Sequence, residues 1–475
     1  MLFRSIKNYF YNSGYQLLAL LVPLITTPYV SRVLGADNIG IYEYIYSIGQ
    51  YFVLFGCLGL NLYGQREIAY CGDDYEKRSK VYSELLIIRV VTMGCAIALY
   101  LITAQFSQYK IYYYYSLFTL LASLIDISWL YQGLEDFRVT VLRNATVKIL
   151  GVIVILTCVK SKDDLWIYFL SHSLTLLVGN ATMWFHKKKY VSFHWAISHN
   201  IIKHVKGTVS LFIPQIAASV YTVLDKTMLG YFASTTQVGY YSQSEKIVKV
   251  AMTIVTSMGV VMLPRVSRLF AEKNEKAIED SIYKSARFVY FIASPIIFGL
   301  IAIVNIFAPW FYGSGYDAVK ILIPIISPII MIIGLSNVVG TQYLVPAKKQ
   351  KEYTISICCG SAVNLVLNAL LIGKYQAIGV SIATVCSECT VTGIQLYFVR
   401  KDFSIKKMFA PIWRYLVSAT AMLVILRFVQ TALPDGVVGI MISCITGAII
   451  YVLILLALKD AFLIEQLNAV FKRRK

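Results

Sequence analysis

The sequence has little charge for its length. Charged residues make up 15% of its 475 residues, whereas soluble domains have about 25%. Hydrophobic residues make up 58%, and most fall in runs of roughly 18–25 residues, each long enough to cross a bilayer as a helix. A soluble protein would expose these runs to water. The composition therefore excludes that class and predicts a polytopic helical membrane protein.

Signatures of catalysis and of a bound cofactor are also missing. The nine cysteines are odd in number and lie mostly inside apolar runs, so no disulfide framework is expected. Cys386 and Cys389 form a C-x-x-C within an apolar segment and without a second pair, which favours packing over a metal or redox site. The chain has no nucleophile–base pair, metal-ligand spacing or nucleotide-binding G-x-x-x-x-G-K-[ST]. We predict no enzyme activity, no metal and no cofactor.

Fourteen spans give the best account of the apolar runs, and the fold class predicted is all-α. The spans fall near 11–34, 41–63, 84–104, 111–132, 142–159, 164–185, 207–232, 241–264, 285–308, 319–342, 353–373, 377–399, 410–431 and 437–458. External loops are short under this assignment, which argues against a membrane enzyme of glycan assembly such as a ligase or polymerase.

The basic residues give the orientation of these spans. Net charge is +19, and Lys and Arg accumulate in cytoplasmic loops, so nucleic acid need not be the partner. With both termini in the cytoplasm, roughly 30 Lys and Arg lie inside and about five outside. We predict a multi-pass protein of a bacterial plasma (inner) membrane. His186, His194, His199 and His204 share one cytoplasmic loop, where a solvated interfacial loop is favoured over a metal site.

An internal repeat relates the two halves of the chain. The first hairpin reads VLG-ADN-IGIY from Val33, and the seventh reads MLG-YFASTTQ-VGYY from Met228. Six spans per half predict two pseudo-symmetric lobes in the same orientation, the parallel-repeat arrangement of several transporters. The predicted domains are an N-terminal lobe at 1–205, a C-terminal lobe at 206–409, and a helix pair with a cytoplasmic tail at 410–475.

Charges lie inside the spans, where each costs about 2.5–3.5 kcal/mol on insertion scales and so marks a cavity or a partner. Two polar stripes follow helical spacing on the seventh and eighth spans. Their members are Gln215, Ser219, Thr222 and Lys226, and then Ser242, Lys246, Lys249, Thr253 and Thr256. Basic residues outnumber acidic ones about two to one in the spans, which favours an anionic guest over a purely structural network.

The candidate residues form two groups. Substrate-binding candidates are Arg32, Lys226, Lys246, Lys249, Arg89 and Arg287, and ion-coupling candidates for a proton or Na⁺ are Asp225, Glu245, Asp126 and Glu388. Several have structural alternatives. Arg287 lies close enough to a cytoplasmic end to snorkel, and Glu245 and Lys249, spaced i, i+4, fit an ion pair.

Four segments resemble the oligosaccharide-lipid flippases of the polysaccharide biosynthesis family (Wzx type), within the superfamily of multidrug, oligosaccharidyl-lipid and polysaccharide exporters. The segments are TTPYVSRVLGADNIGIY, LGLNLYGQREIA, DISWLYQGLEDFRV and LDKTMLGYFASTTQVGYYSQSEKIV, which match in order and spacing. The resemblance implies six plus six helices with two extra C-terminal helices around a central cationic cavity that opens alternately to each side. It also implies an undecaprenyl-diphosphate-linked oligosaccharide as cargo.

Partners implied by the resemblance are the lipid-linked oligosaccharide, membrane lipids, and a polysaccharide polymerase with other assembly proteins. By position in the matching segments, Arg32, Asp225, Lys226, Lys246 and Lys249 are the expected residues of the cavity. An ion-coupled multidrug or small-molecule exporter of the same fold is the main alternative. Organic cations would require net negative charge in the cavity, whereas this one is predicted to be positive.

Overall fold

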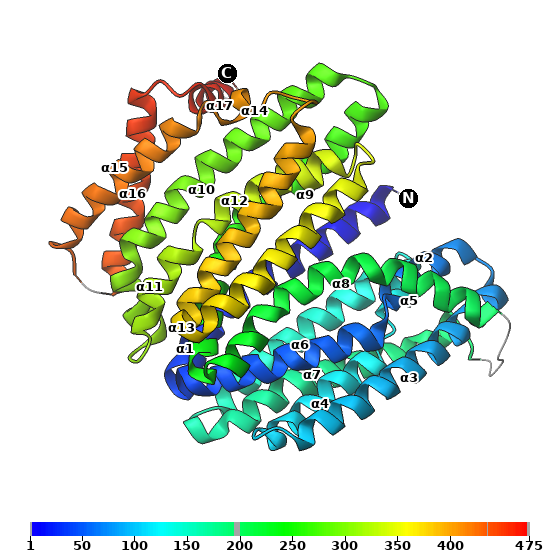
Figure 1. The fold of residues 1–475 in the computed structure, drawn as a ribbon. Coiled ribbons are helices and arrows are strands. Elements are labelled where there is room, and N and C mark those ends of the chain that lie inside the picture. Colours follow the sequence, from blue (N-terminus) through cyan, green and yellow to red (C-terminus); the bar gives the residue numbers. More distant parts are fainter. Residues whose placement is uncertain (1, 194–199, 435, 473–475) are drawn as a thin grey trace. The chain divides into compact units, whose positions relative to one another are not determined.

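A computed structural model describes residues 2–193, 200–434 and 436–472, and within these ranges helices are the only regular elements (Figure 1). The chain divides into two compact units, Met1–Gly239 and Tyr240–Lys475. The predicted all-α polytopic fold is confirmed. Each unit is described by itself below.

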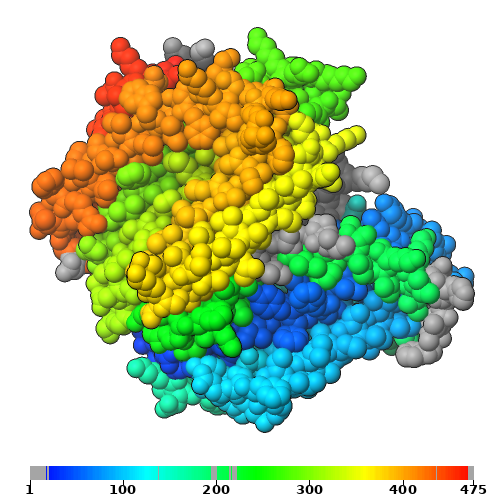
Figure 2. All heavy atoms as spheres, viewed as in Figure 1, coloured from blue at the N-terminus to red at the C-terminus, as the bar shows by residue number. Residues whose placement is uncertain are grey.

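Residues 2–193 and 200–234 of the first unit form eight α-helices and two short 3₁₀ turns. They are α1 (Leu2–Cys57), α2 (Leu60–Cys71), α3 (Tyr75–Gln105), α4 (Lys110–Leu124), α5 (Ser128–Gly133), α6 (Phe137–Cys158), η1 (Lys162–Asp164), α7 (Leu165–His186), η2 (Lys187–Lys189) and α8 (Asn200–Phe232). Helix α1 packs along α3, α4, α6 and α8, and α7 packs against α4 and α6. Figure 2 shows the lighter blue atoms of α3 and α4 on the surface of this unit.

The second unit begins within α9 (Thr235–Ala271). It continues with α10 (Glu275–Tyr312), α11 (Asp317–Ile326), α12 (Ile329–Ser336), the π-helix η3 (Asn337–Leu344), α13 (Gln350–Val399), α14 (Ile405–Phe409), α15 (Ile412–Gln430), α16 (Val437–Ala457) and α17 (Ala461–Lys472). Helix α10 packs against α11, α12, α15 and α16.

All fourteen predicted spans are built mainly of helix. Two pairs of spans form one continuous run each: α1 bends at Gly35 (φ 77°) and α13 at Gln376 (φ 49°). Nine helical runs among the described residues are long and apolar enough to cross a membrane on length and composition alone. Helix α4 is only 15 residues long and is followed, after a break, by α5.

The boundaries of the predicted lobes differ from this division. The contacts place α8 in the first unit, whereas the repeat in the sequence begins the second lobe at residue 206, just before the seventh span. The repeat compares sequence motifs, whereas the two units are defined by contacts within the structure. The two divisions measure different properties, so the lobe boundaries stay a prediction.

The repeated Gly of the two hairpin motifs makes a reciprocal backbone contact. A Cβ added at Gly40 would lie 1.7 Å from the carbonyl oxygen of Thr235, and one added at Gly239 would lie 2.0 Å from that of Ala36. Thr235 lies four residues before Gly239, and Ala36 lies four residues before Gly40, so the two contacts are equivalent in the repeat. Asp37 Oδ1 accepts hydrogen bonds from the hydroxyls of Thr235 (2.5 Å) and Thr236 (3.0 Å). The bend of α1 is therefore fixed to the α8–α9 turn.

Replacing Gly40 by Ala tests this contact. Because the obstacle is a backbone carbonyl, the helices must separate, and overpacking of this kind costs about 1–3 kcal/mol. We expect a lower midpoint of thermal unfolding in detergent for Gly40→Ala.

Gly49→Ala is the matched control on the same helix, because its nearest atoms, on Leu120 and Ser116, would lie 3.8 Å from the new Cβ. Ala favours a helix over Gly, so this midpoint should stay level or rise. Equal midpoints for the two variants would contradict the proposed close contact.

Candidate transport site

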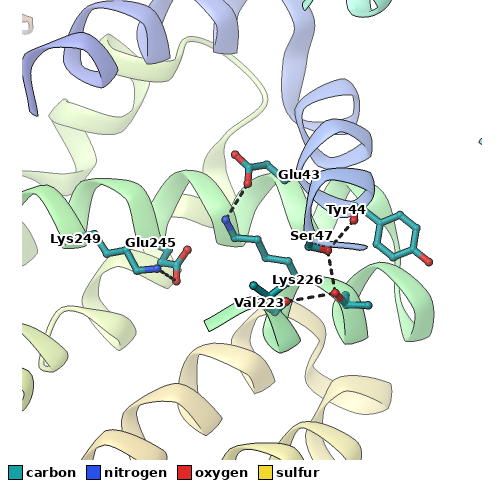
Figure 3. A network of polar contacts seen from close by, with 8 residues as sticks. Glu43, Tyr44, Ser47, Val223, Lys226, Glu245 and Lys249 are labelled. Carbon is teal, nitrogen blue, oxygen red and sulfur yellow. Dashed lines mark hydrogen bonds and ion pairs between the residues drawn. The ribbon is translucent and has the colours of Figure 1, made fainter. Parts of the chain in front are cut away.

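An ion pair joins α1 to α8 inside the predicted membrane-spanning region of the first unit. The Lys226 ammonium lies 2.8 Å from Glu43 Oε2, and the two side chains are 19% and 9% exposed. One turn further along α1, the hydroxyls of Ser47 and Thr227 are 2.9 Å apart, and Ser47 also donates to the Tyr44 carbonyl (Figure 3). A lysine and a carboxylate that share this apolar setting avoid most of the cost of burying either alone.

Aromatic rings extend from this pair toward α7. Tyr42 stacks on Tyr46 (centroids 5.8 Å apart) and on His172 (5.7 Å), and Tyr168 meets the Tyr42 ring edge-on at 4.6 Å. The cluster orders the part of α1 that carries Glu43.

A small cavity with a mixed polar and apolar lining lies one to two turns away. It has a volume of about 280 Å³ and its lining includes Gln50, Tyr51 and Asn61 with Thr222 of the predicted stripe on α8. Thr222 precedes Lys226 by one helical turn, so both share a face. Asp225 is 5% exposed and lies on another face of α8. The side chains of Gln215 and Ser219, which complete the predicted stripe, are outside the described residues.

Arg89 has a different environment from the other cationic candidates. Its side chain on α3 is 1% exposed. Its guanidinium donates to the Cys57 sulfur (2.8 Å), the Ser123 carbonyl (3.1 Å) and the Asn61 side chain. Arg89 thus connects α3 to the ends of α1 and α4. Its predicted contact with substrate requires the guanidinium to leave these hydrogen-bond partners. Asp126 lies next to this site. Its Oδ1 accepts a hydrogen bond from the backbone N–H of Ser128 (N···O 2.8 Å), which stabilises the start of α5.

In the second unit, the i, i+4 alternative is confirmed for Glu245 and Lys249. Their charged groups are 2.7 Å apart on α9, with the lysine side chain 46% exposed and the glutamate 9%. Figure 3 also draws this pair. Lys246 is partly exposed on the same helix. Glu388 on α13 and Arg287 on α10 are both half-buried, whereas Arg32 on α1 of the first unit is exposed.

The ion pairs lower the excess of positive charge that the sequence suggests. Lys226 and Lys249, both predicted to bind substrate, contact carboxylates, and Arg89 donates to three uncharged acceptors. The binding and coupling roles of the ten candidate residues stay predictions. Among the described residues, no group of three or more His, Cys, Asp or Glu is placed to hold a metal ion.

Two buried arrangements were missed by the sequence reasoning. Glu43 was not a candidate, although its position inside the second span was a signal of the kind used for other acids. His204 was assigned to a solvated loop, but it is 5% exposed on α8. Its Nε2 lies 2.9 Å from Glu84 Oε2, and its Nδ1 lies 2.9 Å from the Tyr63 hydroxyl.

The correction for His204 has a structural reason. Helix α8 begins at Asn200, earlier than the predicted span, so one face of its first turns packs on α2 and α3. His194 and His199 lie outside the described residues.

This fold is that of a multi-helix membrane transporter. The chain matches a structure of the lipid II flippase MurJ in an inward closed conformation with a TM-score of 0.78 and 14% identity, over 94% of this chain and 99% of that chain. It also matches an inward-facing multidrug resistance MATE family transporter of the MOP superfamily (TM-score 0.63, 12% identity, 80% of this chain and 93% of that chain).

The family model for polysaccharide biosynthesis proteins matches residues 5–270, and the chain belongs to this family. The MatE family model matches residues 211–370. A protein of Escherichia coli (strain K12), "Putative O-antigen transporter", is 25% identical over 83% of this chain and 97% of its own length. A glycan biosynthesis flippase of Haloferax volcanii, named "Probable low-salt glycan biosynthesis flippase Agl15", is 22% identical over 51% of this chain and 52% of its own length.

These comparisons confirm three predictions. The chain is a member of the polysaccharide biosynthesis family, it is a multi-pass membrane protein, and the relatives named above bear transporter or flippase names rather than enzyme names. The orientation of the termini stays a prediction.

Removing one member of the Glu43–Lys226 pair tests whether it stabilises the fold. Lys226→Ala leaves a buried carboxylate without its ammonium, a change that costs about 3–5 kcal/mol in buried pairs. We expect a clear drop in the midpoint of thermal unfolding. The double variant Glu43→Gln/Lys226→Gln removes both charges, so its midpoint of thermal unfolding should return most of the way to that of the wild-type protein.

Lys249→Gln provides the comparison. The Glu245 side chain is as buried as that of Glu43 (both 9% exposed), but Lys249 is 46% exposed, so solvent screens this pair more and we expect a smaller drop. A double variant as unstable as Lys226→Ala would show that the two charges do not compensate each other.

Proposed function

We propose that this protein is a flippase that moves undecaprenyl-diphosphate-linked oligosaccharide repeat units from the cytoplasmic to the outer leaflet of a bacterial plasma membrane. The observation that carries the proposal is the set of charged side chains inside the predicted spans within residues 5–270, the range of the polysaccharide biosynthesis family. Glu43, Asp225, Lys226, Glu245 and Lys249 all fall there. The relatives named above support a glycan carrier as the cargo.

The proposed mechanism assigns separate environments to the two parts of the cargo. The diphosphate and sugars enter the predicted cationic cavity from the cytoplasm, where Lys and Arg replace part of the lost hydration through charge-assisted hydrogen bonds. The polyprenyl tail remains in lipid. The cavity opens alternately to the two sides, and a proton or Na⁺ resets it. Lipids are partners by necessity, and a polymerase or other assembly protein would take the exported unit.

The Glu43–Lys226 pair offers a chemical route for ion coupling. While Glu43 is ionised, it competes with phosphate for the Lys226 ammonium. Protonation of the carboxylate weakens that attraction and makes the ammonium available to the diphosphate. Glu43 therefore joins Asp225, Glu245, Asp126 and Glu388 as a candidate for the coupling site. Lys246 and Arg32, half-buried and exposed respectively, are the other proposed phosphate contacts.

A reconstituted flipping assay tests the function. Proteoliposomes carry undecaprenyl-diphosphate-linked oligosaccharide, and an impermeant glycosidase reports the sugars that reach the opposite leaflet. We expect exposure that depends on the protein and is lost when Lys226 is neutralised.

The double variant Glu43→Gln/Lys226→Gln is the informative one, because it separates binding from stability. Loss of flipping in a well-folded double variant supports a role for Lys226 in transport. Full activity would limit Lys226 to holding α1 and α8 together. Failure of the wild-type protein to expose a verified native glycan would favour the exporter alternative, for which drug efflux is the next assay.

Glu43→Gln tests the coupling. With the carboxylate replaced by a neutral amide, flipping should respond less to an imposed proton gradient than in wild type, while thermal stability is monitored in parallel. Glu272→Gln is the control, because it removes the carboxylate of an exposed i, i+4 ion pair with Arg268 that has no proposed role in coupling. A response to the gradient equal to that of the wild-type protein would exclude Glu43 as the proton site.

A further inference from the structure

A groove separates part of α6 from α7 in the first unit and has no role in the function proposed above. Its volume is about 800 Å³. Gly179 lets the helices approach on one side, because its Cβ position would lie 2.1 Å from a methyl group of Val147. The lining runs from Val139 to Leu150 on α6 and from Thr175 to His186 on α7.

The groove matches the depth of one membrane leaflet. Each lining stretch covers eleven residue steps, or about 16 Å at 1.5 Å per residue. The hydrocarbon core of a bilayer is about 30 Å thick, so one leaflet contributes about half of that. The apolar rim is open: Val178 is 58% exposed, Leu142 48% and Leu150 45%.

One end of the groove is basic. His186 and Lys189 line it together with Asp136, and Arg143 lines the groove one helical turn beyond Val139 on α6. The Arg143 guanidinium donates to the Asn180 side chain of α7 (2.7 Å). Asp136 accepts a hydrogen bond from the Tyr190 hydroxyl (2.8 Å). Lys187 and Lys188 follow His186 directly, and this end belongs to the loop that the distribution of basic residues assigns to the cytoplasm.

We infer that this groove binds an anionic phospholipid of the cytoplasmic leaflet, with the phosphate at Arg143 and Lys189 and the acyl chains along Leu142, Leu150 and Val178. Basic pockets between transmembrane helices on the cytoplasmic side are the type of site that holds such headgroups. The length of the groove favours a membrane phospholipid over the longer polyprenyl chain of the proposed cargo, because the apolar lining of the groove ends after about the thickness of one leaflet.

The test is lipid binding by the purified full-length protein, measured by native mass spectrometry with phosphatidylglycerol or phosphatidylcholine added to the micelles. We expect preferential retention of phosphatidylglycerol. Arg143→Gln/Lys189→Gln should weaken that binding about tenfold or more, as expected for two cations near an anionic headgroup.

Lys188→Gln is the matched control, because Lys188 belongs to the same three-lysine turn but does not line the groove. Val178→Trp is the second variant, which fills the apolar part without changing charge and should also reduce retention. Both are assayed after their thermal stability has been checked.

Equal binding of the two lipids by the wild-type protein would overturn the inference. So would a loss in Lys188→Gln as large as in the double variant, because that result would indicate attraction to the basic loop as a whole. Retention unaffected by Val178→Trp would exclude the groove as the site of the acyl chains.

Discussion

The structure at the centre of the first unit depends on one requirement: a charged side chain inside the membrane needs a partner of opposite charge. An isolated ion in hydrocarbon is unstable by several kcal/mol, and here Lys226 and Glu43 meet at 2.8 Å between helices that are 183 residues apart in sequence. The hydroxyl contact of Ser47 with Thr227 and the tyrosine cluster around Tyr42 lie on the same stretch of α1. Packing and charge neutralisation thus act on one helix face, and a ligand that competes for Lys226 acts on the contact between α1 and α8.

The sequence predicted features that depend on local spacing. Hydropathy located the spans, because a bilayer requires long apolar helices. The i, i+4 spacing anticipated the Glu245–Lys249 pair. Each of these depends on residues that are neighbours along one helix or within one turn.

The sequence did not predict contacts between distant segments. Nothing near Glu43 indicates Lys226 as its partner, and nothing near Arg89 indicates its three acceptors on other helices. His204 was misplaced because a helix start early by one or two turns moves a residue from the loop to a buried face. The composition gives the number of charged residues, but only the fold shows which of them form ion pairs.

The reciprocal contact of Gly40 and Gly239 has a consequence for the history of the chain. Equivalent residues that meet each other's backbone in this way are what a two-fold symmetric pair of identical subunits produces at its axis. A half-length ancestor could have made the same contact between two copies before duplication joined them. Because the partner atoms are carbonyl oxygens, positions 36 and 235 were then able to diverge to alanine and threonine, while the two glycines had no smaller residue to change to.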